Sequence, residues 1–155
     1  MAMARATETL ITQSLLDRLS TNEDWPATRA ASLRMYREAL KRDMEWLLNT
    51  RRPPLDGIER FTLASRSVIH YGLIDTSALS LSSSNDTRRL QEAIRNCIVA
   101  YEPRLLDVKV VLEQDAAQRR QLRFHIEAQI DLDPAPEEIS FDTILDLTSG
   151  EYKVN

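Results

Sequence analysis

Cysteine and histidine are nearly absent from this sequence. Cys97 is the only cysteine among the 155 residues, so no disulfide can form within the chain. It lies in an apolar helical pattern, where we expect a small buried side chain and not a catalytic thiol. His70 and His125 are the only histidines, and their spacing is not typical of a metal site. We therefore predict neither a metal nor any other cofactor.

Glycine and long apolar runs are scarce as well. Gly57, Gly72 and Gly150 stand far apart, which excludes a glycine-rich phosphate loop, and the Gly-x-Ser-x-Gly elbow of hydrolases is missing. No apolar run approaches the roughly 18 to 20 residues that a membrane span needs. The N-terminal residues also lack the continuous apolar stretch of a signal peptide. These absences predict a cytoplasmic protein that does not insert directly into a membrane.

Neither sign of charge dominates. The chain has 20 basic and 24 acidic side chains and a net charge of −4, which argues against nucleic acid as the main partner. Aromatic residues make up only 6%, too few for the aromatic platforms that usually line sugar-binding clefts. With 43% apolar and 28% charged residues, the composition is that of one ordinary globular domain with a moderate core.

Apolar residues at helical spacing dominate the first two thirds of the chain. They predict a short amphipathic helix over residues 10–19, a long helix over residues 28–48, and a further helix that stops before Pro103. The long helix has one apolar stripe, which consists of Leu33, Tyr36, Leu40, Met44 and Leu47. Asn49 and the two prolines after it suit the end of this helix.

The segment between the second and third helices is less regular. We predict a short helix over residues 67–71 that ends at Gly72. The polar loop that follows supplies N-cap candidates for the third helix in Ser84, Asn85 and Asp86.

Apolar and polar residues alternate in the last third of the chain, as in half-buried strands. In the first strand we expect one face to carry Leu106, Val108, Val110 and Leu112. In the second we expect one face to carry Leu122, Phe124, Ile126, Ala128 and Ile130. A third alternating run consists of Phe141, Thr143, Leu145 and Leu147. The polar stretch between the first two strands predicts a hairpin loop, and "TSGEYKV" predicts a turn into a short last strand.

Helices first and strands last indicate a single α+β domain, with the N-terminal helices packed on a small antiparallel or mixed C-terminal sheet. We expect residues 1–26 to form a mobile N-terminal helix and connector, and residues 27–155 to form the domain proper. An edge strand of a small sheet presents unpaired N–H and C=O groups. Another chain can extend such a sheet by strand addition.

The junction between the last helix and the first strand, "IVAYEPRLLDV", places an acid, a proline and a base at one corner. Glu102 and Asp107 would be the paired carboxylates of a glycosidase, but Arg104 would favour the ionised form of Glu102, which a general acid must avoid. Because Pro103 fixes the backbone, the spacing better suits a fork between guanidinium and carboxylate. Such a fork either braces the corner within the chain or presents itself to another chain.

Two adjacent arginines follow the long helix. Arg51 and Arg52 precede a pair of prolines, so we expect them on an extended, exposed segment. They are candidates for binding a partner that carries carboxylates; the alternative is that they only lie on a loop.

Several stretches of the chain are similar, in order, to one known family. They are "SLLDRL", "RDMEWLLNTRR", "SVIHYGLIDTSALS", "IRNCIVAYEPRLLDVKV" and "ISFDTILDLTSGEYKV". The chain resembles the phage baseplate wedge and sheath-initiator family, once labelled lysozyme-like, and more closely the TssE baseplate subunits of bacterial type VI secretion systems. It departs from the family pattern at His70, where asparagine is expected, and at Ile74, where proline is common.

The resemblance implies a structural role and no enzymatic activity. Members of this family sit in the baseplate wedge with the TssF and TssG subunits, and TssK is a further candidate partner. Their strands resemble those of the sheath subunits TssB and TssC, so that the first sheath ring can build on them. Glu102, Pro103 and Arg104 match the Glu-Pro-Arg motif of the family, which is expected to dock the subunit onto the wedge.

The same resemblance implies a place for the protein in the cell. The chain would be cytoplasmic, in a baseplate that is docked at the inner-membrane complex. The alternative function is a peptidoglycan-cleaving, lysozyme-like enzyme that uses Glu102.

Overall fold

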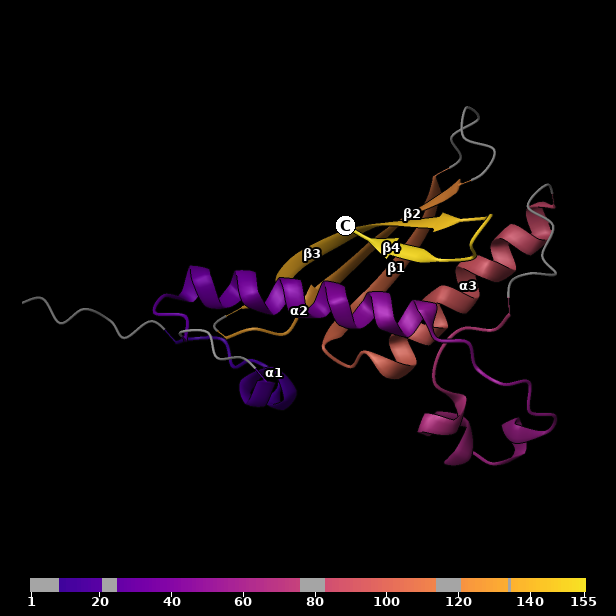
Figure 1. The fold of residues 1–155 in the computed structure, drawn as a ribbon, viewed down its shortest axis with the longest axis horizontal. Coiled ribbons are helices and arrows are strands. Elements are labelled where there is room, and N and C mark those ends of the chain that lie inside the picture. Colours follow the sequence, from indigo (N-terminus) through magenta and orange to yellow (C-terminus); the bar gives the residue numbers. More distant parts are fainter. Residues whose placement is uncertain (1–8, 21–24, 76–82, 114–120, 134) are drawn as a thin grey trace, which may run out of the picture.

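The computed structural model describes residues 9–20, 25–75, 83–113, 121–133 and 135–155. Its elements in chain order are α1 (Leu15–Ser20), α2 (Arg29–Asn49), η1 (Ile58–Arg60), η2 (Ala64–Arg66), η3 (Val68–His70), α3 (Ser84–Tyr101), β1 (Leu105–Glu113), β2 (Gln121–Ile130), β3 (Glu137–Asp146) and β4 (Tyr152–Val154). The strands form one antiparallel sheet in the order β1-β2-β3-β4. The two long helices, α2 and α3, precede the sheet and lie along it (Figure 1). This arrangement confirms the predicted α+β fold.

The longest helix, α2, has the apolar stripe that the sequence predicts. The hydroxyl of Thr28 caps its start by accepting a hydrogen bond from the N–H of Ala31 at 3.2 Å. Leu40, Met44 and Leu47 are buried in the core. None of the helices within the described ranges is long and apolar enough to cross a membrane.

The start of α3 differs by one residue from the prediction. The hydroxyl that caps this helix belongs to Ser83, which accepts from the N–H of Asp86 at 3.3 Å, whereas Ser84, Asn85 and Asp86 lie in the first turn. Every residue in this run has a side-chain oxygen that can cap a helix, so the composition alone does not fix the register. The helix ends at Tyr101, before the proline, as predicted.

The two short predicted helices are shorter than expected. The first, α1, begins at Leu15, so Leu10 lies outside it, and none of its residues is buried. The second is only the 3₁₀ turn η3. Helices shorter than three or four turns gain little from backbone hydrogen bonding alone, and neither of these has a buried side chain to stabilise it.

The start of β1 contradicts the predicted alternation. Leu105 is 4% exposed and Leu106 is 41% exposed. The buried residue is therefore Leu105 and not Leu106, which the sequence placed on the same face as Val108. A β-bulge follows Leu106, and Asp107 within it has a left-handed φ of 51°. Because a bulge inserts one extra residue, it shifts the side-chain alternation. Beyond the bulge the prediction is confirmed, and Val108 and Val110 are buried.

The second and third strands alternate as predicted. The buried side chains of β2 are those of Phe124, Ile126, Ala128 and Ile130, and Leu122 is partly buried. The buried side chains of β3 include those of Phe141, Thr143 and Leu145. Leu147 lies in the turn that leads to β4, and the loop residues between β1 and β2 fall outside the described ranges. The inward face of the sheet therefore packs on α2 and α3 and forms the core.

Residues 51–74, which we call the lobe, contain η1, η2 and η3 and extend away from the sheet beside the end of α3 (Figure 1). A parallel bridge joins the lobe to the end of α2. The N–H of Leu73 donates to the carbonyl of Thr50 at 2.8 Å, and the N–H of Arg52 donates to the carbonyl of Leu73 at 2.9 Å. Gly72 at this bridge has a φ of 100°, a conformation that favours glycine.

Candidate functional site

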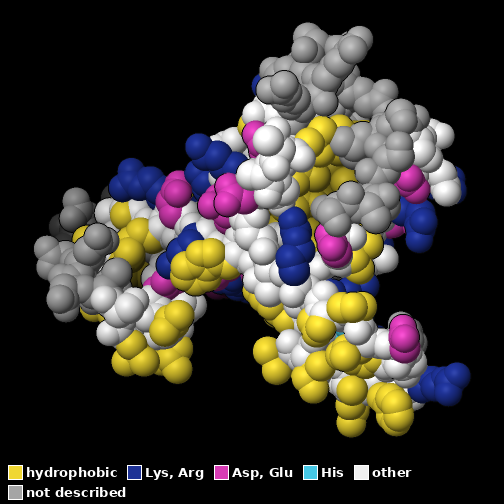
Figure 2. Space-filling model, turned by 45° about the vertical axis from the view of Figure 1, so that its right-hand side comes forward, with side chains coloured by type: hydrophobic (Ala, Val, Ile, Leu, Met, Phe, Trp, Pro, Cys, Tyr) yellow, Lys and Arg dark blue, Asp and Glu magenta, His cyan; other side chains and the backbone are white. Residues whose placement is uncertain are grey.

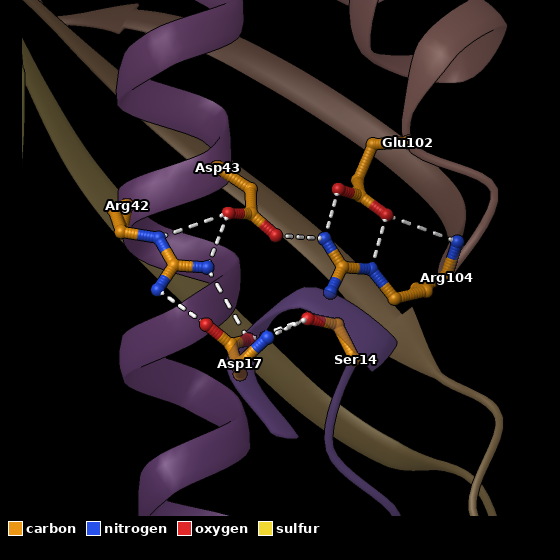
Figure 3. A network of polar contacts seen from close by, with 6 residues as sticks. All are labelled: Ser14, Asp17, Arg42, Asp43, Glu102 and Arg104. Carbon is orange, nitrogen blue, oxygen red and sulfur yellow. Dashed lines mark hydrogen bonds and ion pairs between the residues drawn. The ribbon is translucent and has the colours of Figure 1, made fainter. Parts of the chain in front are cut away.

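The corner (Glu102, Pro103 and Arg104) forms a fork between carboxylate and guanidinium. Glu102 is only 5% exposed. Its carboxylate accepts from Arg104 Nε at 2.6 Å and from Arg104 Nη2 at 2.5 Å (Figure 3). The same carboxylate also accepts from the backbone N–H of Arg104 at 3.3 Å, while Pro103 is exposed. The two charged side chains of the motif therefore pair with each other inside the chain.

The fork continues into a chain of alternating charges. Arg104 Nη2 also donates to Asp43 Oδ2 at 2.7 Å. Asp43 Oδ1 accepts from Arg42 Nη2 at 2.8 Å, and Arg42 Nη1 donates to Asp17 Oδ1 at 2.7 Å. The hydroxyl of Ser14 completes the chain with a 2.6 Å hydrogen bond to Asp17. The network thus ties α1 and α2 to the corner between α3 and β1 (Figure 3).

The electrostatics of this network stabilise its charged forms. The hydrogen bond to Glu102 raises the pKa of Arg104, although burial opposes the shift. The hydrogen bond from Arg42 lowers the pKa of Asp17 below its ordinary value of 3.8. Because the pKa of Asp17 is lower in the folded state, the contact with Arg42 contributes to stability above the unfolded-state pKa and is lost as the pH falls through the folded-state pKa. Acid therefore weakens the attachment of α1 to α2.

This geometry does not support a pair of catalytic carboxylates. Arg104 engages both oxygens of Glu102, so the carboxylate is taken up by an ion pair within the chain. Asp107 is an exposed residue of the β-bulge. Within the described part of the chain, no three His, Cys, Asp or Glu side chains gather in a way that could hold a metal ion.

Asp43 links the corner to α2 and is not among the site residues predicted from the sequence. This residue follows Leu40 by three positions and precedes Leu47 by four, so it lies on the same side of the helix as the apolar stripe. A carboxylate at such a position is expected to have cationic partners, and Arg104 and Arg42 are those partners. The helical position of Asp43 was the signal that could have revealed the network.

Arg51 and Arg52 contact different parts of the molecule. Arg51 Nη2 donates to the carbonyl of Gly150 at 2.5 Å, and its guanidinium lies 5.9 Å from the centroid of the Tyr152 ring. Arg52 is partly buried in the lobe, with Nη1 3.5 Å from Nδ1 of His70. Arg51 therefore contacts the end of the sheet, Arg52 contacts the lobe, and neither is hydrogen-bonded to the corner.

The outer edge of β4 is covered by side chains of α2. The amide of Asn49 accepts from the N–H of Tyr152 and donates to its carbonyl, both at 2.8 Å. A neighbouring strand would make the same pair of hydrogen bonds. Glu45 Oε2 accepts from the N–H of Val154 at 3.2 Å. The prediction that this edge presents unpaired backbone groups is therefore wrong for Tyr152 and for the N–H of Val154.

The outer edge of β1 is covered in a similar way by α3. Gln91 Nε2 donates to the carbonyl of Val110 at 2.5 Å, and Arg95 Nε donates to the carbonyl of Val108 at 3.2 Å. Long polar side chains on the two helices reach both edges because the helices lie along the sheet (Figure 1). Covering an edge in this way is one means by which native proteins prevent unwanted strand pairing.

The side chain of Cys97 is buried, as the sequence predicts. Cys97 is 7% exposed, and burial raises the pKa of its thiol to about 11. Because the thiolate is the reactive form, this side chain is unreactive at neutral pH.

We expect the pKa of His125 to lie above 6.5 in the folded protein. His125 Nδ1 lies 2.8 Å from Asp142 Oδ1 on the neighbouring strand, and this hydrogen bond is the main cause of the raised pKa. The contribution of the pair to stability is therefore present below the unfolded-state pKa and is lost as the pH rises through the folded-state pKa.

An NMR titration of the His125 ring tests this expectation. The pKa should fall toward 6.5 in Asp142→Asn and change less in the control Glu127→Gln, whose carboxylate lies 3.8 Å from Nε2 of the ring. A wild-type pKa at or below 6.5 would contradict the expectation.

Comparison with known proteins gives the family. Residues 34–135 match the family model described as baseplate wedge protein gp25. No curated protein and no solved structure matches the chain. The matched region is more than half of the chain and includes the lobe, the corner and the first two strands. It confirms the resemblance inferred from the sequence. The chain therefore belongs to the baseplate wedge protein gp25 family, the family of TssE.

Proposed function

We propose that this chain is a subunit of a type VI secretion baseplate that docks onto the wedge subunits TssF and TssG. The family match over residues 34–135 carries this proposal, because that family supports a structural role in a baseplate. In the same proposal TssK is a further partner, and the sheath subunits TssB and TssC build on the sheet. The protein then works in the cytoplasm, within a baseplate docked at the inner-membrane complex.

The surface of the chain supports a role within an assembly. Large apolar side chains are exposed on α1, on α2 and on the lobe, and they include Leu15, Leu16, Leu19, Trp46, Phe61, Leu63 and Val68. Figure 2 shows two clusters of hydrophobic side chains that project from one face of the molecule. Contiguous apolar patches of this kind mark protein–protein interaction sites.

We assign the docking role of the Glu-Pro-Arg motif to its exposed part. Pro103 is exposed, and the side chain of Arg104 is 26% exposed. In the described chain Arg104 Nη1 has no hydrogen-bond partner (Figure 3), so its donors are available to a carboxylate or carbonyl of another subunit. In this proposal Glu102 positions Arg104 and does not itself contact the partner, and Arg51 and Arg52 are further candidate contacts.

Strand addition by sheath subunits is also part of the proposal, and the covered edges constrain it. A strand that joins β4 must replace the amide of Asn49. A strand that joins β1 must replace Gln91 and Arg95. Because the net contribution of one hydrogen bond is only about 0.5 to 1.5 kcal/mol, backbone hydrogen bonds to an incoming strand can offset the loss of these side-chain contacts.

Complex formation with purified TssF and TssG tests the proposed function. We expect the wild-type chain to elute with them as one species in size-exclusion chromatography with light scattering. Arg104→Ala should weaken the complex, whereas the control Arg123→Ala removes an exposed arginine of β2 and should leave it unchanged. A folded wild-type chain that elutes separately from TssF and TssG at tens of micromolar would show that the proposal is wrong.

The alternative enzymatic function makes a different prediction. We expect no release of fragments from purified peptidoglycan by the wild-type chain, because Arg104 holds both oxygens of Glu102. An added muralytic enzyme serves as the positive control. Release of fragments by wild type that is lost in Glu102→Gln would instead establish the lysozyme-like activity.

A further inference from the structure

The lobe presents a cluster of apolar side chains to solvent. Leu63 is 88% exposed, Val68 84%, Phe61 66% and Ile69 55%. These side chains belong to the part of the chain from which one of the hydrophobic clusters in Figure 2 projects. By contrast, Ile58 in the same lobe is 8% exposed and belongs to the buried side chains. The apolar side chains of the lobe are thus partly buried and partly on its outer surface. We call the four most exposed ones the lobe cluster (Phe61, Leu63, Val68 and Ile69).

Local contacts hold the lobe cluster in place. The hydroxyl of Ser67 accepts from the N–H of Ile69 at 3.3 Å and so caps η3. Tyr71 packs edge-on against Tyr101 of α3, with ring centroids 5.2 Å apart. The hydroxyl of Tyr101 donates to the carbonyl of Ser67 at 3.3 Å. A preorganised apolar surface loses little conformational entropy when a partner covers it.

The lobe also carries arginines that are not paired with carboxylates. Within the described residues, Arg52, Arg60 and Arg66 have no carboxylate at salt-bridge distance. Arg42 and Arg104, in contrast, each pair with a carboxylate at 2.7 Å. The lobe thus differs from the corner in having guanidinium groups that are available to carboxylates of another chain.

One of these arginines, Arg52, lines a hollow between the lobe and α3. The hollow has a volume of about 410 Å³, and its lining includes Arg52, His70, Arg89 and Tyr101. The lining also includes Cys97, whose thiol is protonated at neutral pH because burial raises its pKa to about 11. The hollow is large enough for one side chain of a partner. Glu92 also lines it, and Arg89 lies 4.0 Å from Asp86, so Arg52 is the guanidinium there that is available to an acidic side chain of a partner.

We propose that the lobe binds a protein partner in the wedge through an apolar surface that is bordered by carboxylates. The lobe cluster packs against the apolar part of that surface, and the carboxylates pair with Arg52, Arg60 and Arg66. This inference rests on the proposed function and names the surface that carries it out. The lobe has four arginines against two carboxylates, Asp56 and Glu59. A symmetric contact between two lobes would therefore leave an excess of positive charge, so charge favours a more acidic partner over a second copy of the chain.

Two variants of the lobe test the inference, with purified TssF and TssG as the probe. Leu63→Ser combined with Val68→Ser reduces the apolar surface at exposed positions, and Arg66→Glu reverses one unpaired charge. We expect each to weaken binding about tenfold or more, as loss of central interface contacts does. A matched control, Val99→Ser combined with Val111→Ser, removes side chains that are 52% and 50% exposed on α3 and β1 and should bind like wild type.

The outcomes distinguish this inference from the proposed function. If wild type binds TssF and TssG and both lobe variants bind as tightly as wild type, the inference is overturned and the proposed function stands. If folded wild type does not bind, both are overturned. If wild type is a dimer and the double lobe variant is a monomer, the lobe is an interface between two copies and the inference is overturned. Circular dichroism shows whether each variant is folded. If the double variant is unfolded, Arg66→Glu decides the result, because it changes an exposed position.

Discussion

Replacement of Arg104 by alanine is expected to lower the free energy of unfolding by about 3 kcal/mol. The substitution leaves the carboxylate of Glu102, which is 5% exposed, without its guanidinium partner. It also removes the 2.7 Å contact between Arg104 and Asp43, which connects the corner to α2. We place the loss at the lower end of the range for broken buried ion pairs, because the side chain of Arg104 is 26% exposed. Urea denaturation monitored by circular dichroism measures the effect.

A double-mutant cycle separates the pair from other effects of the substitution. Glu102→Ala, Arg104→Ala and the double variant should show a coupling energy of about 1 kcal/mol or more, since the two side chains share a fork. The control Arg123→Ala removes an exposed arginine and should stay within about 0.5 kcal/mol of wild type. If Arg104→Ala proves as stable as Arg123→Ala, the corner does not brace the fold.

Gly72→Ala is expected to destabilise the protein by about 3 kcal/mol or more, through strain at a positive φ and a clash that the backbone must move to relieve. Gly72 has a φ of 100°, and a Cβ built at this position lies 2.3 Å from the carbonyl oxygen of Thr50. That oxygen accepts from the N–H of Leu73 in the bridge that joins the lobe to α2. The substitution therefore acts on the attachment of the lobe as well as on global stability. Thermal and urea unfolding both measure it.

Gly57 provides a matched control for this prediction. Its φ is 76°, and a Cβ built there has nothing within 4 Å, so Gly57→Ala adds conformational strain without a clash. We expect it to cost about 1 kcal/mol. Equal losses for Gly57→Ala and Gly72→Ala would show that the close approach at Thr50 is not a constraint on the fold.

The order and type of the main elements could be predicted from the sequence, because both depend on local periodicity. The stripe through Leu40, Met44 and Leu47 and the alternation through Phe124 and Ile126 each specify one buried face. These patterns are sufficient for an α+β architecture with the helices first.

Features that depend on the backbone or on distant side chains could not be predicted. Alternation alone does not show the bulge after Leu106, since the bulge inserts a residue without a change of residue type. Nor does it show that Asn49 would cover the edge of β4, because that contact joins residues 103 positions apart.

The candidate site was predicted in part. The sequence shows that an acid and a base flank Pro103, and the structure confirms that they form a fork. It does not show that Asp43 and Arg42 extend the fork to α1, since this needs the packing of α2 against the corner. A motif of three residues is thus part of a network that holds several elements together.

This network gives the motif a physical role that is compatible with docking. By fixing α2 against the corner, Arg104 also fixes the helix from which the lobe extends, and Pro103 stays exposed beside it. An assembly subunit benefits from a rigid surface, because rigidity reduces the entropy lost on binding. The corner would therefore support docking both by direct contact and by holding the neighbouring surface in place.

Hydrogen–deuterium exchange of the chain, alone and in complex with TssF and TssG, tests the central claim most directly. That claim is that the corner and the lobe together form the docking face. The account predicts that formation of the complex slows exchange of the backbone amides in residues 55–71 and of Arg104. The backbone amides of β2 should exchange at unchanged rates. Unchanged exchange in the lobe and at the corner, with protection confined to other parts of the chain, would contradict it.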